Sequence, residues 1–331
     1  MALPLSGYAV ATATNPPSSL TDFSLLVDLS KMPTEWWAAA EDTTGNRGRA
    51  AKATGEELPS DWIDYNHGAQ TGFVRVLWSG ELSDSGSQAV RIYPPQAANS
   101  AYAANATYGQ YNAYDSFTEA YWPLSDDGTW ADRTGNHSGV SEEGTPGTDT
   151  GKVGDGMSCN GAEGVNTGNG WLGGETAITI TCWFKASPAA ADSDLLSVPT
   201  HGWEGLLLFR DEYTSGDRFA CVAQDSGGDN FPGLVLYSSD NSASAAGAWQ
   251  HVALRLDFPS SQLDFFFDGF PDSDNPQSTG DVDNIRNGDD VIIGAASGSS
   301  ADCLGVIDEM IVSFTSRSAD WISHEHAQTD D

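Results

Sequence analysis

The sequence predicts an all-β chain made of two domains in tandem. Short segments in which apolar and polar residues alternate are typical of strands that bury one face. Clusters of Gly, Ser, Asn and Asp separate these segments, as turns do in all-β proteins. The length of 331 residues exceeds the usual size of one domain, and 39% hydrophobic residues supply enough apolar surface for two cores.

The first domain is expected to cover residues 1–115. Three apolar segments bounded by turn clusters are its strand candidates: residues 25–27, 72–78 and 89–93. Residues 33–40 have the length of one or two helical turns. Pro94 and Pro95 end the last strand, because proline has no N–H to donate to a sheet. Residues 96–115, rich in Ala, Asn and Tyr, are expected to form a connector.

The second domain is expected to cover residues 116–331, and its strands are easier to recognise. Four segments are its strand candidates: residues 178–185, 249–256, 263–267 and 304–314. Asp268 and Gly269 follow the third segment, and this dipeptide is typical of a two-residue β-hairpin turn. His324 and His326, near the end of the chain, are expected to be exposed and to bind no metal.

The charge of the chain is strongly acidic and uneven. Asp and Glu number 47 against 14 Lys and Arg, a net charge of −33. Residues 1–97 hold 11 acidic and 6 basic side chains, a net charge of −5, which leaves −28 for residues 98–331. Repulsion at this density destabilises a compact fold in dilute salt, whereas multimolar salt shortens the Debye length to about 3 Å. We therefore expect adaptation to brine; an acidic protein that binds cations or basic partners is the alternative.

Composition also bears on partners and compartment. Nucleic acid is not expected as a partner, because the sequence has no basic patch. No stretch of about 18 consecutive apolar residues is present, so no membrane span is expected. Residues 1–17 show neither the positive charge nor the apolar run of a signal peptide, which predicts synthesis in the cytoplasm without ordinary secretion.

The four cysteines all lie in the second domain, in segments that look like strands: Cys159, Cys182, Cys221 and Cys303. None of them forms a C-x-x-C pair, so the sequence gives little support for a structural zinc site. Their positions favour buried thiols, and one or two disulfides are the alternative.

Motifs of the second domain occur together, in this order, in one known family. They include the Asp-x-Thr-Gly-Asn turn of residues 132–136, the strands of residues 178–184 and 249–253, and the Ile-Asp-Glu strand of residues 307–309. On these motifs, residues 117–327 resemble the laminin-G-like branch of the concanavalin A-like lectin/glucanase jelly rolls. The resemblance implies a short helix over residues 318–322.

The first domain shows a looser resemblance. Residues 21–29, 91–93 and 107–109 resemble a β-sandwich domain of unknown function that often precedes laminin-G-like modules in surface and virus-tail proteins of bacteria and archaea. Pro94 and Pro95 stand where that family usually has Tyr-Gly-Asn, so the end of this strand departs from the family pattern.

The resemblance implies a structural Ca²⁺ site. In many laminin-G-like domains the Asp of the Asp-x-Thr-Gly-Asn turn approaches the Asp of Ile-Asp-Glu. In this chain the corresponding ligands are Asp132, Asn136 and Asp308, and Ca²⁺ prefers such carboxylate and amide oxygens. The alternative is that Asp132 and Asn136 cap a tight turn without an ion, with Asp308 hydrogen-bonded to it.

Carbohydrate binding is the usual inference for this fold. Sugars are recognised by aromatic faces together with polar groups. Four aromatic residues in or near loop-like segments are the candidates: Trp171, Trp203, Phe231 and Tyr237. For any one of them, packing in a core or an interface is the alternative.

Glycoside hydrolysis is not expected. It requires two carboxylates on either side of one glycosidic bond, and related glucanases carry them as Glu-x-Asp-x-x-Glu along one strand. This sequence has no such strand, and its acidic residues fall in turns. They are therefore expected to be solvated surface groups.

These expectations combine into a non-enzymatic structural protein on the virion surface of a tailed virus of halophilic archaea, as a capsid decoration, a turret or a tail component. The first domain would attach to other virion proteins, and the second would project and bind host glycans. Such a protein is expected to form a trimer or a pentamer. A cellular haloarchaeal surface protein that binds carbohydrate is the alternative, and a glycoside hydrolase is a weaker one.

Overall fold

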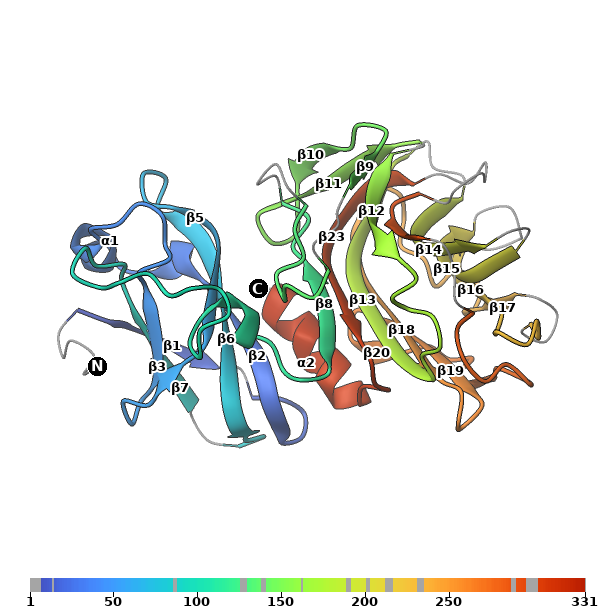
Figure 1. The fold of residues 1–331 in the computed structure, drawn as a ribbon, viewed down its shortest axis with the longest axis horizontal. Helices are drawn as coiled ribbons and strands as arrows, with labels where there is room; N and C mark the ends of the chain where they lie inside the picture. Colours follow the sequence, from blue (N-terminus) through green and yellow to red (C-terminus); the bar gives the residue numbers. More distant parts are fainter. Residues whose placement is uncertain are drawn as a thin grey trace. The chain divides into compact units, whose positions relative to one another are not determined.

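The structure of the protein is a computed structural model, drawn in Figure 1. It describes residues 7–13, 15–85, 88–125, 130–137, 141–161, 163–188, 192–200, 203–211, 217–230, 235–286, 290–295 and 303–330. Strands dominate this part of the chain, with two α-helices, α1 (Thr34–Ala39) and α2 (Ala319–Asp330), and two short 3₁₀ helices, η1 (Leu29–Lys31) and η2 (Gln110–Asn112). The all-β prediction is confirmed.

The chain divides into two compact units. The first unit comprises Met1–Thr118 together with Ser323–Asp331, and the second comprises Glu119–Ile322. The last residues of the chain therefore belong with the first unit, whereas the sequence places them in the second domain. Among the described residues, no helix is long and apolar enough to cross a membrane.

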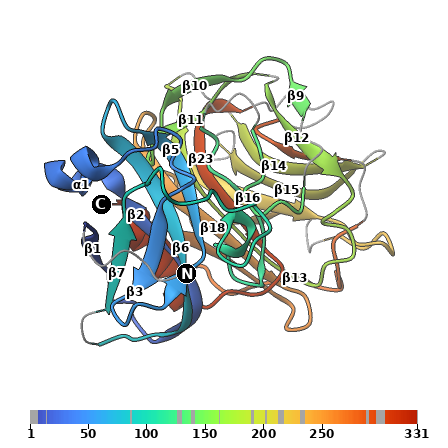
Figure 2. The same cartoon turned by 60° about the vertical axis from the view of Figure 1, so that its left-hand side comes forward.

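The first unit contains two antiparallel sheets (Figures 1 and 2). The three-stranded sheet has the order β2 (Leu20–Asp28), β6 (Thr71–Leu82), β5 (Ser60–Asn66). The four-stranded sheet has the order β1 (Ala9–Ala13), β7 (Gln88–Tyr93), β3 (Arg49–Lys52), β4 (Glu57–Leu58). Strand β7 ends directly before Pro94, as expected from the missing N–H.

The residues that pack in the first unit include two adjacent tryptophans from α1. Trp36 and Trp37 are 3% and 2% exposed, and their rings meet edge to face with 4.8 Å between centroids. The indole N–H of Trp36 donates to the carbonyl of Ile92 on β7 over 2.8 Å, so this short helix is held to the four-stranded sheet. The helical turns predicted for residues 33–40 are confirmed.

The C-terminal segment of α2 is part of the packing of the first unit. A guanidinium N–H of Arg75 on β6 donates to Glu325 over 2.9 Å, and both side chains are almost fully buried. The backbone N–H of Leu26 on β2 donates to the Gln328 amide oxygen over 2.8 Å. The His324 ring lies 4.7 Å from the Phe23 ring and is 1% exposed, so the prediction of an exposed His324 is wrong.

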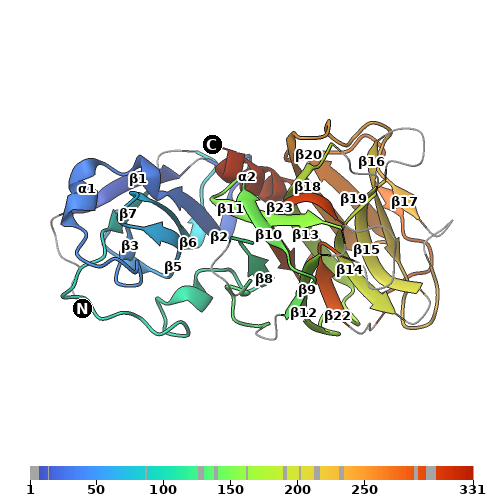
Figure 3. The same cartoon turned by 90° about the horizontal axis from the view of Figure 1, so that it is seen from above.

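The second unit contains two larger sheets, whose strands are labelled in the view from above in Figure 3. The nine-stranded sheet has the order β10 (Gly147–Thr150), β11 (Asp155–Asn160), β23 (Leu304–Ser313), β13 (Ala177–Ala186), β18 (Trp249–Asp257), β19 (Gln262–Phe267), β20 (Phe270–Pro271), with β8 (Thr118–Trp122) paired to β23 and β21 (Gln277–Ser278) to β19. The seven-stranded sheet has the order β17 (Leu236–Tyr237), β16 (Arg218–Ala223), β15 (Trp203–Asp211), β14 (Ser193–Thr200), β22 (Asp290–Ile293), β12 (Gly164–Asn169), β9 (Ser141–Glu143).

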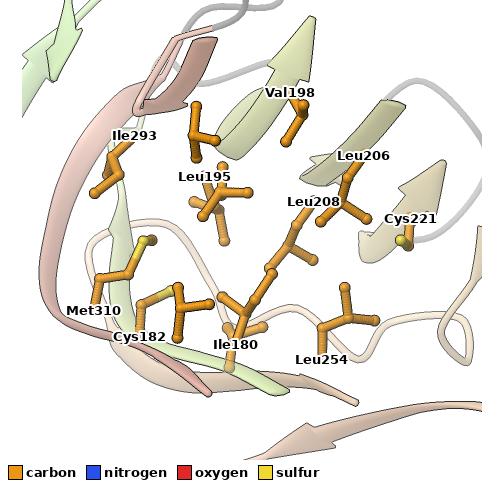
Figure 4. Close-up of a cluster of buried hydrophobic side chains, with 14 of the residues drawn as sticks. Ile180, Cys182, Leu195, Val198, Leu206, Leu208, Cys221, Leu254, Ile293 and Met310 are labelled. Carbon is orange, nitrogen blue, oxygen red and sulfur yellow. The ribbon is translucent and has the colours of Figure 1, made fainter. Parts of the chain in front are cut away.

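One hydrophobic core lies between these two sheets (Figure 4). Alternate residues of β13, Ile180 and Cys182 among them, point into it, because successive side chains of a strand point to opposite faces. Leu206 and Leu208 of β15 enter it from the seven-stranded sheet. Each fully buried Leu or Ile side chain contributes about 1.5–3 kcal/mol relative to exposure, so this shared layer holds the two sheets together.

Three further sequence predictions concern local features of the chain. Asp268 and Gly269 have φ of 49° and 78° and join β19 to β20, which is the turn with two positive φ values that favours Asp-Gly. All four cysteines are buried free thiols, as their strand-like surroundings predict. The C-terminal helix α2 has 12 residues and is longer than the short helix expected over residues 318–322.

We expect the stability of the protein to fall on acidification because of His324. Neither ring nitrogen of His324 has a hydrogen-bond partner, and burial lowers its pKa below the ordinary 6.5, although the nearby Glu325 carboxylate opposes this shift. The stabilisation from neutral His324 is complete above the unfolded-state pKa and is lost as the pH falls through the lower folded-state pKa.

Chemical unfolding of the wild type and of His324→Phe, followed between about pH 7.5 and pH 5 at fixed high salt, checks this expectation. The wild type is expected to lose more stability than the variant, whose ring can still pack on Phe23. His326→Gln removes a histidine from the same helix and should keep the wild-type slope. Equal slopes for the wild type and His324→Phe would contradict the assignment.

Candidate functional site

The outward face of the seven-stranded sheet carries half-buried apolar side chains that take no part in the core. Leu207 and Phe209 alternate along β15 with the core residues Leu206 and Leu208. The neighbouring strands contribute further half-buried side chains to this face. We define the outer patch as Leu207, Phe209, Val222 and Tyr237.

Strand register brings the outer patch together. Phe209 pairs with Ala220 of β16, and Ala220 pairs with Tyr237 of β17. Leu207 pairs with Val222 two residues further along the same two strands, and therefore on the same face. Directly opposite residues have Cβ atoms about 4.5–5.5 Å apart, so these side chains form one continuous surface across three strands. The small side chain of Ala220 separates the two aromatic rings.

A charged group borders the outer patch at Tyr237. The Arg218 guanidinium lies 3.8 Å from the centre of the Tyr237 ring, a distance at which the cation and the ring attract each other. The same guanidinium donates to Asp240 over 3.1 Å and lies 4.0 Å from Asp211. The cation thus covers one area of the tyrosine ring and is itself held by carboxylates.

Amide groups border the patch where β16 ends. The Gln224 side-chain N–H₂ donates to the carbonyl of Gly228 over 3.3 Å and to the side-chain oxygen of Asn230 over 3.2 Å. The Arg286 guanidinium donates to the Gln224 side-chain oxygen. Beyond them, the hydroxyl of Ser226 donates to the Asn284 side-chain oxygen over 3.1 Å. An apolar surface with aromatic rings and polar borders can bind a ligand that has both apolar faces and hydroxyl groups.

Of the four aromatic residues predicted to bind sugar, one has a described side chain that lies in the outer patch. Tyr237 lies in it. Trp203 begins β15 and its backbone pairs with Thr200, but its side chain lies outside what is described. Phe231 lies outside the described residues. Sequence reasoning missed the other members of the patch, Leu207, Phe209 and Val222. It looked for aromatic residues in loops, whereas these residues lie in strands β15 and β16.

Trp171 lies elsewhere and has partners of its own. Its ring packs against the core and lies 4.1 Å from the His137 ring. Its indole N–H donates to the Thr167 hydroxyl over 3.1 Å. These contacts support the packing alternative for Trp171.

Asp132 serves as the acceptor at the centre of a tight turn. One carboxylate oxygen accepts the backbone N–H groups of Tyr121 and Thr134, both over 3.0 Å. The other accepts those of Asn136 and His137, also over 3.0 Å. A carboxylate has about four lone-pair positions, and these donors fill them. The calcium prediction stays a prediction, and these contacts give Asp132 a role that needs no ion.

Asp308 holds a different segment. One of its oxygens accepts the backbone N–H groups of Lys152 and Val153 over 2.6 and 2.8 Å, and the other accepts that of Glu309 over 2.9 Å. Burial, followed by the neighbouring Glu309 carboxylate, raises the pKa of Asp308. Among the described residues no group of three or more His, Cys, Asp and Glu side chains is placed to hold a metal ion. Asp308 is fully buried, which keeps it from contacting a substrate.

Asp132→Ala is expected to lower the free energy of unfolding by about 2–3 kcal/mol, because it leaves buried N–H donors without an acceptor. Since four backbone N–H groups already occupy the lone pairs of the Asp132 carboxylate, a chelator such as EGTA should leave the melting temperature of the wild type unchanged at fixed high salt. Asp149→Ala, at an exposed position of β10, is the matched control. A chelator effect on the wild type that is absent in Asp132→Ala would instead establish a Ca²⁺ ion at this turn.

Solved structures with a similar fold include a domain of an arabinanase and the binding domain of a mosquitocidal protein. Domain 4 of AbnA, a GH43 extracellular arabinanase from Geobacillus stearothermophilus, solved in complex with arabinotriose, is 14% identical with a TM-score of 0.51, over 62% of this chain and 96% of that domain. The binding domain of Paraclostridial Mosquitocidal Protein 1 is 10% identical with a TM-score of 0.50, over 63% of this chain and 51% of that one. At these identities the likeness shows the fold alone.

Sequence comparison adds a family for the second unit. No curated protein sequence matches the chain. The family model described as the concanavalin A-like lectin/glucanases superfamily matches residues 160–323. The predicted relationship is confirmed over that segment, and the second unit contains a jelly-roll domain of the concanavalin A-like lectin/glucanase type.

Proposed function

We propose that this chain is a non-enzymatic structural protein on the virion surface of a halophilic archaeal virus, and that its second unit binds host carbohydrate. The outer patch is the observation that carries the binding role. A sugar ring presents C–H groups on its faces and hydroxyl groups at its edge. The rings of Phe209 and Tyr237 can pack against the C–H groups of a sugar. The carboxylates and amides that border the patch can form hydrogen bonds with its hydroxyl groups.

The electrostatics of the second unit favour an uncharged ligand. Its residues 119–322 hold 32 acidic and 8 basic side chains, a net charge of −24, which repels anionic sugars wherever salt does not screen it. Asp211 and Asp240 already pair with Arg218, so that cation is not free to select a carboxylate on a ligand. Neutral oligosaccharides are therefore the proposed class. A domain of the same fold, solved in complex with arabinotriose, supports this choice.

The charge distribution supports the virion role. A net charge of −33 suits brine, and the milder −5 of residues 1–97 suits a surface that other virion proteins cover. The first unit is proposed as the attachment unit, in a capsid decoration, a turret or a tail, and the second as the one exposed to the medium. Assembly as a trimer or a pentamer is part of this proposal.

Tyr237→Ala and Phe209→Ala are each expected to weaken binding of neutral oligosaccharides about tenfold or more, which corresponds to about 1.4 kcal/mol, because each removes an aromatic ring from the patch. Titration calorimetry in high salt measures this. Tyr111→Ala removes a 42% exposed tyrosine from the first unit and should bind like the wild type. Wild-type affinity in both patch variants would show that the sugar binds elsewhere, and no binding across a panel of neutral glycans would overturn the carbohydrate role.

Mass spectrometry of purified virus particles from lysed haloarchaeal cultures tests the virion role. The protein is expected in the particle fraction, in fixed ratio to the major capsid protein after repeated density gradients. Recovery with the cell envelope alone would favour the alternative, a cellular surface protein that binds carbohydrate. Turnover of a polysaccharide, lost on removal of one carboxylate, would contradict the non-enzymatic role.

A further inference from the structure

Two of the four buried cysteines are neighbours at one end of the nine-stranded sheet. Cys159 lies in β11, and Cys303 directly precedes β23. These strands are antiparallel, and Cys159 pairs with Gly305. The backbone N–H of Gly161 donates to the carbonyl of Cys303 over 3.1 Å. Residues two apart in a strand share a face, so the two cysteines are diagonal neighbours on the core side.

Gly294, at the end of β22, leaves room for the sulfur of Cys159. The backbone N–H of Cys303 donates to the Gly294 carbonyl over 3.0 Å. A Cβ at Gly294 would lie only 2.9 Å from the Cys159 sulfur, and its φ of +85° is one that other residues rarely adopt. The sulfur of Cys159 and the backbone of Cys303 therefore converge on this glycine.

We propose that Cys159 and Cys303 form a redox-sensitive pair that a low-molecular-weight disulfide converts into an intramolecular disulfide. One protein thiolate attacks a sulfur of the reagent and releases one thiolate, leaving a mixed disulfide. The second protein thiolate then attacks the protein sulfur of that mixed disulfide and releases the second. The protein loses two protons and two electrons, and the reagent is reduced to two thiols.

Burial sets the rate of this reaction. Cys303 is 0% exposed and Cys159 is 4% exposed, so a reagent reaches them only when the end of the sheet opens. The neighbouring Cys159 thiol and burial raise the pKa of Cys303, which keeps the attacking thiolate scarce while the sheet is closed. The pair should therefore stay reduced under brief exposure and oxidise when β11 and β23 separate locally.

The protein is treated with oxidised glutathione at high salt, with and without mild denaturant. It is then unfolded and alkylated, and its mass is measured by mass spectrometry before and after alkylation. The expected product is about 2 Da lighter before alkylation, retains two alkylatable thiols, and yields a peptide cross-linked between Cys159 and Cys303. Oxidation should be faster in mild denaturant. Dithiothreitol should restore all four thiols. The closed loop should raise the melting temperature by about 5–10 °C.

Matched variants identify the pair. Cys159→Ala and Cys303→Ala should no longer form the intramolecular product, whereas Cys221→Ala should form it as the wild type does. Cys182 lies close enough to influence Cys303 electrostatically, so Cys182→Ala tests the competing pair and should also form the product. A cross-link to Cys182, a glutathione adduct as the final product, or four free thiols even in mild denaturant would overturn the proposal. Peptide mapping of the wild type decides the case if a variant fails to fold.

Discussion

The shared core of the two sheets in the second unit constrains every other surface of that unit. Successive residues of a strand point to opposite faces, so a strand that sends Leu206 and Leu208 into the core must present Leu207 and Phe209 on the other side. Moving the register by one residue would exchange the two sets and remove the core. The outer patch is therefore fixed as firmly as the core itself. A binding surface on a sheet is more rigid than one on loops, and ligand contacts there need little ordering on binding.

Polar groups in the same unit serve mainly to tie chain segments to this framework. Asp132 and Asp308 each accept several backbone N–H groups, and both are almost fully buried. An unsatisfied buried N–H costs about 1–3 kcal/mol, so each carboxylate offsets the cost of folding a segment that lacks sheet partners. In the first unit a buried ion pair between Arg75 and Glu325 joins the end of the chain to β6. This strongly acidic chain thus uses some of its carboxylates inside the fold, as hydrogen-bond acceptors and in ion pairs.

The elements that the sequence predicts well are those whose signals are local. The alternation in β13, the prolines after β7 and the Asp-Gly turn before β20 each depend on neighbouring residues alone. The outer patch could not be found this way, because residues 206–209 are continuously apolar and give no sign of which face each side chain takes. The packing of the C-terminal segment in the first unit could not be predicted from the sequence for a different reason. Glu325 and Arg75 are 250 residues apart, and only the folded chain brings them together.

Under the proposed adaptation to brine, the net charge and the outer patch both follow from the high salt concentration of the solvent. At multimolar salt the Debye length is about 3 Å, so ion pairs with a ligand lose most of their strength, while apolar contacts and short hydrogen bonds keep theirs. A surface protein of brine that must recognise a partner is therefore better served by rings and methyl groups than by charge. The second unit follows this division, since most of the net charge of the chain lies in its residues while the outer patch consists of the uncharged residues Leu207, Phe209, Val222 and Tyr237. In the proposed function, the acidic surface keeps the protein soluble and the uncharged outer patch binds the ligand.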